Sequence, residues 1–203
     1  MGSDPMMLPA SVDLFWLPLG AGDNTHCVRT NGRLLEAIAA GREHRPRGDL
    51  FHAALVVALG DDEWTIEMGP AWGSSEPHLG VVCHGPVGSR WLGRSRYFRY
   101  EVRRWRGGTI PDLAEAVDSP RRVSSDAVRA ELTLSLAPAF PTATWGRDEL
   151  GAGEMWNSNS LVAWLLARSG HDLSTIHPPQ GGRAPGWSAG LVVAARDSVP
   201  SPA

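Results

Sequence analysis

The sequence predicts an α+β fold in which helices flank an antiparallel β-sheet. Short apolar or alternating runs separated by Gly- and Pro-containing turns dominate the first half of the chain, and they are typical of strands. Stretches with helical spacing follow in the second half, and each begins at a polar residue and ends near Gly or Pro. Strands followed by helices favour the α+β class. The chain has 203 residues, 42% of them hydrophobic, which is enough to bury a sizeable core.

In the first half, the residue patterns predict a hairpin preceded by a strand and a helix. The apolar run 51–59 and the alternating run 64–68 are separated by the turn signal Gly60-Asp61-Asp62, and this pattern predicts two paired strands. The other elements expected here are a strand over 11–17, a loop over 20–24, a helix from Asn31 to about Gly41, and a strand over 78–84.

The second half is expected to contribute one more long strand and most of the helices. Residues 97–105 alternate aromatic or aliphatic side chains with Arg and Glu, as a half-exposed strand does. Three helices and a last strand are expected at 110–117, from Ser124 or Ser125 to about 137, from Asn157 or Ser158 to about Arg168, and at 191–195. We expect one domain over 11–196, with residues 1–10 a flexible N-terminus or a cloning remnant and 197–203 a frayed end.

Composition excludes several classes of function. The net charge of -3 argues against nucleic acid or an anionic membrane as an obvious partner of the whole molecule. All 19 basic residues are Arg, which excludes Schiff-base chemistry and a lysine general base. The two cysteines, Cys27 and Cys83, make neither a disulfide framework nor a zinc motif, although they could pair with each other. We expect no cofactor, no metal, no secretory signal and no membrane helix, and hence a cytoplasmic protein.

The most informative stretch is the polar start of the helix predicted from residue 157. Four polar residues, Asn157 to Ser160, stand between Trp156 and the apolar run Leu161-Val162-Ala163-Trp164. Ser158 would lie near a helix N-terminus, where free backbone N–H groups and the helix dipole stabilise negative charge. An N-cap role explains one of the four polar residues, and position alone favours that role for Ser158 over a chemical one.

His52 and Glu67 are the candidate partners of Ser158. His52 interrupts the apolar strand 51–59, and a lone histidine there is more often a satisfied core residue than a catalyst. Glu67 lies between apolar residues on the returning strand. Whether Glu67 shares a face with His52 depends on the turn length, because a slip of one residue reverses the side. If it does, Glu67 could orient the imidazole as the third member of a catalytic triad.

Arginine and tryptophan are the other side chains that could bind a ligand. Seven arginines between Arg90 and Arg106 are interleaved with aromatic residues, a pattern that can track single-stranded nucleic acid but is more simply a solvated strand face. Of the nine tryptophans, Trp72, Trp91 and Trp187 lie near Gly or Pro and could line a cleft.

The order of these elements resembles the circularly permuted papain-like superfamily, which includes NlpC-type and lecithin:retinol acyltransferase-like proteins. The resemblance covers about residues 50–195 and rests on Phe51-His52-Ala53 in a strand, Ile66-Glu67-Met68 in the next, and Trp156-Asn157-Ser158-Asn159 at a late helix start. It implies that His52 is the family histidine, that Glu67 matches the third polar residue, and that Ser158 stands in place of the nucleophilic cysteine. A serine hydroxyl does not ionise as a thiol does and needs a well-aligned base.

The resemblance implies a hydrolase or acyltransferase that acts on an amide or acyl bond of a peptide or lipid. Ser158 could be a natural nucleophile, the mark of a pseudoenzyme, or a deliberate exchange of cysteine. The alternative is a non-catalytic module that binds a small molecule or peptide. In either case the residues expected to contact the ligand are Asn157, Asn159, Trp72 and Trp187.

Overall fold

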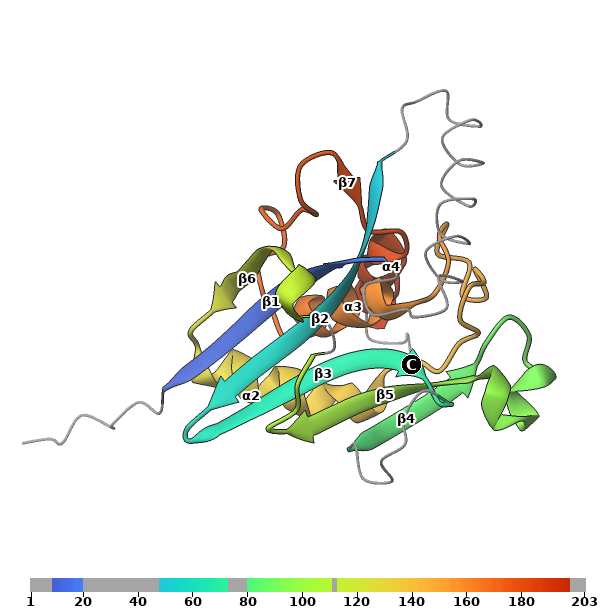
Figure 1. The fold of residues 1–203 in the computed structure, drawn as a ribbon, viewed down its shortest axis with the longest axis horizontal. Helices are drawn as coiled ribbons and strands as arrows, with labels where there is room; N and C mark the ends of the chain where they lie inside the picture. Colours follow the sequence, from blue (N-terminus) through green and yellow to red (C-terminus); the bar gives the residue numbers. More distant parts are fainter. Residues whose placement is uncertain (1–8, 20–47, 73–79, 111–112, 198–203) are drawn as a thin grey trace, which may run out of the picture.

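The computed structural model describes residues 9–19, 48–72, 80–110 and 113–197, and six of their strands form an antiparallel sheet (Figure 1). The spatial order of the strands is β4-β5-β3-β2-β1-β6. Their bounds are Ala10–Pro18 (β1), Asp49–Leu59 (β2), Asp62–Pro70 (β3), Val81–Pro86 (β4), Arg99–Arg106 (β5) and Val117–Ser124 (β6). A two-residue strand, β7 (Gly182–Arg183), pairs in parallel with the start of β2. The expected α+β class with an antiparallel sheet is therefore confirmed.

Strand β2 lies inside the sheet and shows how the sequence divides its side chains between the two faces. Phe51, Ala53, Leu55 and Val57 belong to the main core. Ala54 belongs instead to a second cluster, on the other side of the sheet, with Phe15, Leu17 and Ile110. Because successive strand residues point to opposite faces, the alternation assigns every side chain of β2 to one face or the other. We call the two sides the helix face and the second face.

In the part of the chain that the structure describes, three α-helices cover the helix face (Figure 1). They are α2 (Ala127–Leu136), α3 (Ser158–Arg168) and α4 (Trp187–Asp197). Helix α3 is buried along nearly its whole length and packs between the sheet and α4. Gly190 permits this close packing, because a Cβ at that position would collide with the Ser160 carbonyl oxygen of α3. Four short 3₁₀ turns connect the elements: η1 (Leu92–Arg94), η2 (Arg96–Phe98), η3 (Leu113–Glu115) and η4 (Ala137–Ala139).

Three local expectations were wrong. The helix expected over 110–117 is the single turn η3 followed by strand β6, which is stabilised by pairing with β1. The strand expected over 191–195 is part of helix α4, whose Ala189, Val193 and Ala194 are buried on one side in the main core. The cap of α2 is neither Ser124 nor Ser125 but Asp126, whose carboxylate accepts hydrogen bonds from two backbone N–H groups. The loop expected over 20–24 and the helix expected from Asn31 lie outside the described residues.

Candidate functional site

The polar start of α3 closes its own helix end. The side-chain oxygen of Asn157 accepts hydrogen bonds from the backbone N–H groups of Asn159, at 2.9 Å, and Ser160, at 3.3 Å. The Ser160 hydroxyl in turn accepts one from the Asn157 N–H at 3.1 Å, which completes a capping box. Asn157 and Ser160 therefore satisfy backbone donors that the first turn of a helix leaves without partners.

The same residues fasten α3 to the segment that precedes α4. The side-chain amides of Asn157 and Asn159 both donate to the Pro185 carbonyl, at 2.8 and 2.9 Å, and the Ser160 hydroxyl donates to the Gly186 carbonyl at 2.8 Å. Gly186 has a φ of +88°, and a Cβ there would collide with the Asn157 side chain, so no other residue fits. Three of the four polar residues at this helix start, Asn157, Asn159 and Ser160, are thus explained by a structural clamp.

Ser158 is the one member of the polar run that this clamp does not use. It is the first residue of α3 and is 6% exposed. Its hydroxyl makes no hydrogen bond with any other of the described residues. The helix dipole favours negative charge at this position, but a serine needs a base to become a nucleophile. Whether a base is present therefore decides the chemistry open to Ser158.

The structure does not bring His52 to Ser158. His52 is paired across the sheet with Leu17, and Leu17 belongs to the cluster on the second face. Its neighbours Phe51 and Ala53 point to the helix face, where α3 lies. The imidazole therefore points away from α3, and the Ser158–His52 pair expected from the sequence is not formed.

The environment of His52 also makes it a poor base. The side chain is half-buried by surface area, yet surrounding protein atoms desolvate it enough to lower its pKa to about 4. A general base works best with a pKa near the operating pH, so an imidazole with this pKa would take up a proton only weakly at neutral pH.

Glu67 shares the second face with His52 but is engaged elsewhere. Its carboxylate forms an ion pair with Arg103 at 3.2 Å, and Arg103 also meets Glu101 at 3.2 Å. Burial raises the pKa of Glu67, and the Arg103 charge opposes that rise. No hydrogen bond links Glu67 to His52 within the described part of the chain. Glu67 is therefore not placed as the third member of a triad with Ser158.

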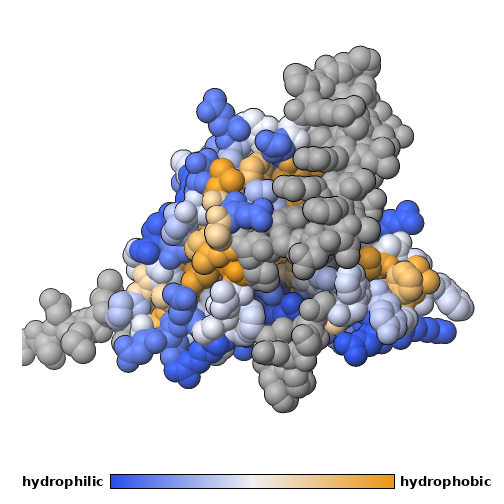
Figure 2. Space-filling model, viewed as in Figure 1, coloured by the Kyte–Doolittle hydropathy of each residue, from blue (hydrophilic) through white to orange (hydrophobic). Residues whose placement is uncertain are grey.

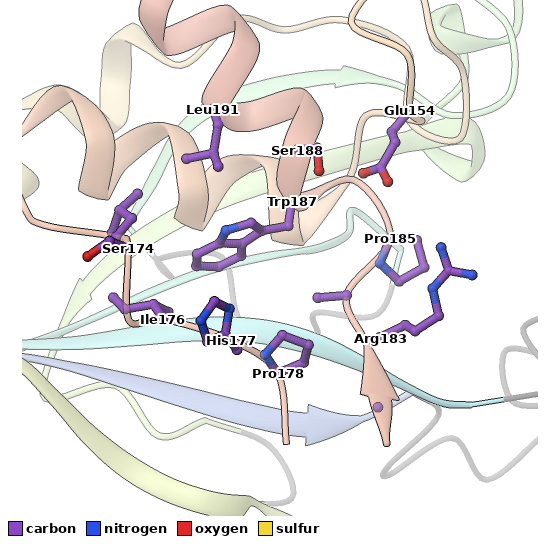
Figure 3. A pocket seen from close by; sticks show the side chains of 13 residues that line it. Glu154, Ser174, Ile176, His177, Pro178, Arg183, Pro185, Trp187, Ser188 and Leu191 are labelled. Atoms are coloured by element: carbon purple, nitrogen blue, oxygen red, sulfur yellow. The ribbon is translucent and has the colours of Figure 1, made fainter. Parts of the chain in front are cut away.

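A pocket of about 440 Å³ lies beside the start of α4 and is lined in part by β7, which pairs with the start of β2 (Figure 3). We call it the Trp187 pocket, because the Trp187 indole lies at its centre. Leu191 and Ser188 reach it from α4, and the segment carrying Ile176, His177 and Pro178 closes the opposite side. The remaining lining residues are Glu154, Leu173, Ser174, Gly182, Arg183, Ala184 and Pro185.

The walls of this pocket are held in place by hydrogen bonds between segments that lie 26 to 32 residues apart in the chain. Asn157 and Asn159 fix Pro185, and the Glu154 carboxylate accepts a hydrogen bond of 2.8 Å from the Gly186 N–H. The Trp187 ring packs against Trp16, with the ring centroids 5.2 Å apart. A pocket that is preformed in this way loses little entropy when a ligand binds.

The chemistry of the Trp187 pocket is mixed. Aliphatic and proline side chains and the face of Trp187 supply apolar surface, while Glu154, His177 and Arg183 supply charged or titratable groups of both signs. Such a surface suits a small ligand with an apolar body and polar ends. Of the residues expected to contact a ligand, Trp187 lines the pocket, Asn157 and Asn159 support its wall, and Trp72 lies outside it with 57% of its surface exposed.

Sequence reasoning missed His177, Arg183 and Glu154. The available signal was the run His177-Pro178-Pro179-Gln180-Gly181-Gly182-Arg183, a Pro- and Gly-rich loop that carries two titratable side chains and leads into Trp187. Ligand-binding residues are concentrated on loops of this kind. The contribution of Glu154 depends on folding, because 32 residues separate it from its partner Gly186.

Within the described residues, no group of three or more His, Cys, Asp or Glu side chains is placed to hold a metal ion. None of the helices there is both long and apolar enough to cross a membrane. Comparison with known protein families, curated proteins and solved structures finds no match to this chain. The papain-like assignment therefore stays a prediction, and the case for function rests on the geometry alone.

Proposed function

We propose that the protein is a non-catalytic binding module that holds a small molecule or short peptide in the Trp187 pocket. The observation that carries the proposal is a preformed pocket of about 440 Å³ with an aromatic centre, apolar walls and charges of both signs. A second observation supports it: the Ser158 hydroxyl makes no hydrogen bond with another described residue, and His52 points to the other side of the sheet. The location that goes with this proposal is the cytoplasm.

The charges of the pocket narrow the ligand class. Glu154 and Arg183 both lie on the Pro185 side of the pocket, whereas Ile176 lies on the other. A ligand that presents both an acceptor and a donor at one end and an apolar group at the other fits this division. Short peptides and cell-wall fragments have donors and acceptors at one end together with apolar groups elsewhere. Acyl-glycerols are included in the screen as more apolar ligands for comparison.

A screen with a pocket-filling variant tests the proposal. Peptides, cell-wall fragments and acyl-glycerols are screened by calorimetry against the full chain. Ser188→Trp places a large ring at the pocket, because Ser188 lines it from the surface of α4. Ala195→Trp is the matched control, since Ala195 is exposed on the same helix and outside the pocket. We expect a hit whose affinity falls at least tenfold in Ser188→Trp only. Equal affinity in the two variants would refute the Trp187 pocket as the site.

The second candidate is the hydrolase or acyltransferase that the papain-like resemblance implies. One observation favours it: the Ser158 hydroxyl lies at a helix start without a hydrogen-bond partner in the described parts of the chain. Labelling with a serine-reactive fluorophosphonate tests it, with Ser158→Ala as the control. Labelling that depends on Ser158 would favour this candidate, and its absence would remove it.

A further inference from the structure

A lobe of residues 89–99 projects beyond the ends of β4 and β5 (Figure 1). It contains the two 3₁₀ turns η1 and η2, and Arg99 holds it together from inside. The Arg99 guanidinium donates to the carbonyl of Gly93 at 2.6 Å and to that of Arg94 at 3.1 Å. The side chain of Ser95 caps η2. The lobe is therefore a defined structure with a fixed outer surface.

The outer surface of the lobe is apolar and aromatic. Trp91 is 77% exposed and Tyr97 69%, and Leu92 and Phe98 are 45% and 43% exposed. Large apolar side chains gathered in this way on a projecting surface mark an interaction site, whereas single exposed ones need no explanation. The exposed apolar side chains of the lobe therefore indicate that it binds a partner.

The lobe is also basic, although the whole chain has a net charge of -3. It contains four arginines and no acidic residue. Arg90 forms an ion pair with Glu149, and the Arg94 guanidinium lies 4.8 Å from the centre of the Trp91 ring. Arg96 has no partner within the described residues. Apolar and basic surface therefore lie side by side at this end of the molecule (Figure 2).

The arginines of strand β5 that follow Arg99 do not belong to this surface. Arg103 is buried between Glu67 and Glu101, Arg104 donates to the Leu134 carbonyl at 2.8 Å, and Arg106 pairs with Asp62. Strand β5 therefore cannot bind along a nucleic-acid backbone, although the spacing of its arginines in the sequence is compatible with such binding. The surface that remains available to a partner is the projecting lobe rather than a groove. Proteins bind single-stranded nucleic acids in grooves.

We propose that the lobe of residues 89–99 is a peripheral membrane-binding surface that attaches the protein to an anionic lipid bilayer. Aromatic side chains favour the interface between headgroups and acyl chains. Leu92 and the ring of Phe98 add apolar surface that base stacking would not use, and they enter the acyl boundary beside Trp91. The Arg94 and Arg96 guanidinium groups meet the lipid phosphates.

Vesicle co-sedimentation of the full chain tests this proposal. The protein is mixed with vesicles of pure phosphatidylcholine or with vesicles that also contain about 30% phosphatidylserine. The phosphatidylserine gives the second set a negative surface. We expect binding to the anionic vesicles, weaker binding as salt is raised, and little binding to the neutral ones. Arg94→Gln/Arg96→Gln should weaken the binding about fivefold for each arginine removed. Arg106→Gln/Arg129→Gln is the control, because both residues are exposed and lie outside the lobe.

A second pair of variants tests the apolar half. Trp91→Ser/Tyr97→Ser should abolish sedimentation at the lipid concentration that half-saturates the wild type, whereas Trp72→Ser, which changes an exposed tryptophan elsewhere, should not. Circular dichroism confirms that each variant is folded. Failure to bind anionic vesicles at low salt, or equal binding by lobe and control variants, would overturn the proposal. So would lobe-dependent binding of single-stranded RNA without binding to vesicles.

Discussion

The side-chain amide of Asn159 donates a hydrogen bond of 3.0 Å to the carbonyl oxygen of Phe51, and it thereby joins the start of α3 to β2. The same amide also donates to Pro185, so one buried side chain ties together a strand, a helix and the wall of the Trp187 pocket. His52 follows Phe51 directly, yet its side chain points to the second face. The side chain that connects α3 to β2 is therefore Asn159, which binds the backbone of β2, and not His52.

Removing this connection should destabilise the fold. Asn159→Ala removes the side-chain donor of the Phe51 carbonyl oxygen in a buried site, whereas the Pro185 carbonyl keeps its hydrogen bond from Asn157. An unpaired buried polar group costs about 1–3 kcal/mol, so we expect the free energy of unfolding to fall by about that amount. Urea denaturation measures it. Ser158→Ala is the matched control and should change the free energy of unfolding by less than about 1 kcal/mol, because no hydrogen bond to a described residue is lost. Equal losses in the two variants would contradict the clamp.

The reactivity of a thiol at position 158 separates a cap from a catalytic centre. In Ser158→Cys, a neighbouring imidazolium would lower the thiol pKa, but His52 faces away from α3. We therefore expect alkylation by iodoacetamide at a rate that His52→Ala does not change. Burial raises the pKa of Cys83 to about 11, so this native thiol gives the slow reference rate. A rate at pH 7 that falls several-fold on removal of His52 would restore the Ser158–His52 pair.

The stability of the protein should depend on His52 between pH 4 and pH 6.5. Desolvation lowers the pKa of His52 from 6.5 to about 4 in the folded state, so the unfolded chain binds more protons in this range. Stability is therefore complete above about pH 7, falls as the pH drops through 6.5, and levels off below 4. The difference corresponds to a contribution of order 3 kcal/mol.

The variant His52→Gln isolates this dependence, since glutamine does not titrate. The raised pKa of Glu67 acts in the opposite direction over part of the same range, but it is present in both proteins. The difference between the two profiles of unfolding free energy against pH should therefore follow His52 alone. Parallel profiles across pH 4–7 would show that His52 is not desolvated.

Arg103 should be much more important for stability than Arg106 on the same strand. The Arg103 side chain is 9% exposed and neutralises two carboxylates, those of Glu67 and Glu101. Arg103→Met leaves both charges without their partner, and breaking a buried pair in this way costs about 3–5 kcal/mol. Arg106 forms an exposed pair with Asp62, so Arg106→Met should cost about 0–1 kcal/mol. Thermal unfolding of the two variants compares them, and similar melting temperatures would contradict the network.

Local signals in the sequence were sufficient for the parts of the fold that are stabilised locally. The β2–β3 hairpin has its alternating apolar pattern and its Gly-Asp turn, and α3 has its polar cap. Strand β6 and helix α4 were missed because tertiary contacts decide them. The run Ser119-Pro120-Arg121-Arg122 becomes a strand only by pairing with β1, and the β-branched run of α4 is helical because one side packs on α3.

The candidate site also depends on tertiary structure that local sequence patterns do not record. A shift of one residue in register moves a strand side chain to the other face, so the sequence could not decide whether His52 faces α3. Ser158 and His52 have the order along the chain that the papain-like resemblance requires, but the alternation of β2 separates them. The Trp187 pocket depends on contacts between distant segments, such as Glu154 with Gly186, which no local pattern records.

Non-catalytic binding in the Trp187 pocket is tested most directly by NMR of the indole N–H signals while a ligand from the screen is added. Mass spectrometry then measures whether the ligand is consumed. Trp187→Phe and Trp72→Phe assign the two signals that matter. We expect that the Trp187 signal shifts with saturation, that the Trp72 signal does not, and that mass spectrometry recovers the ligand unchanged after prolonged incubation. A ligand that leaves the Trp187 signal unmoved, or one that is converted to product by the wild type but not by Ser158→Ala, would contradict non-catalytic binding in this pocket.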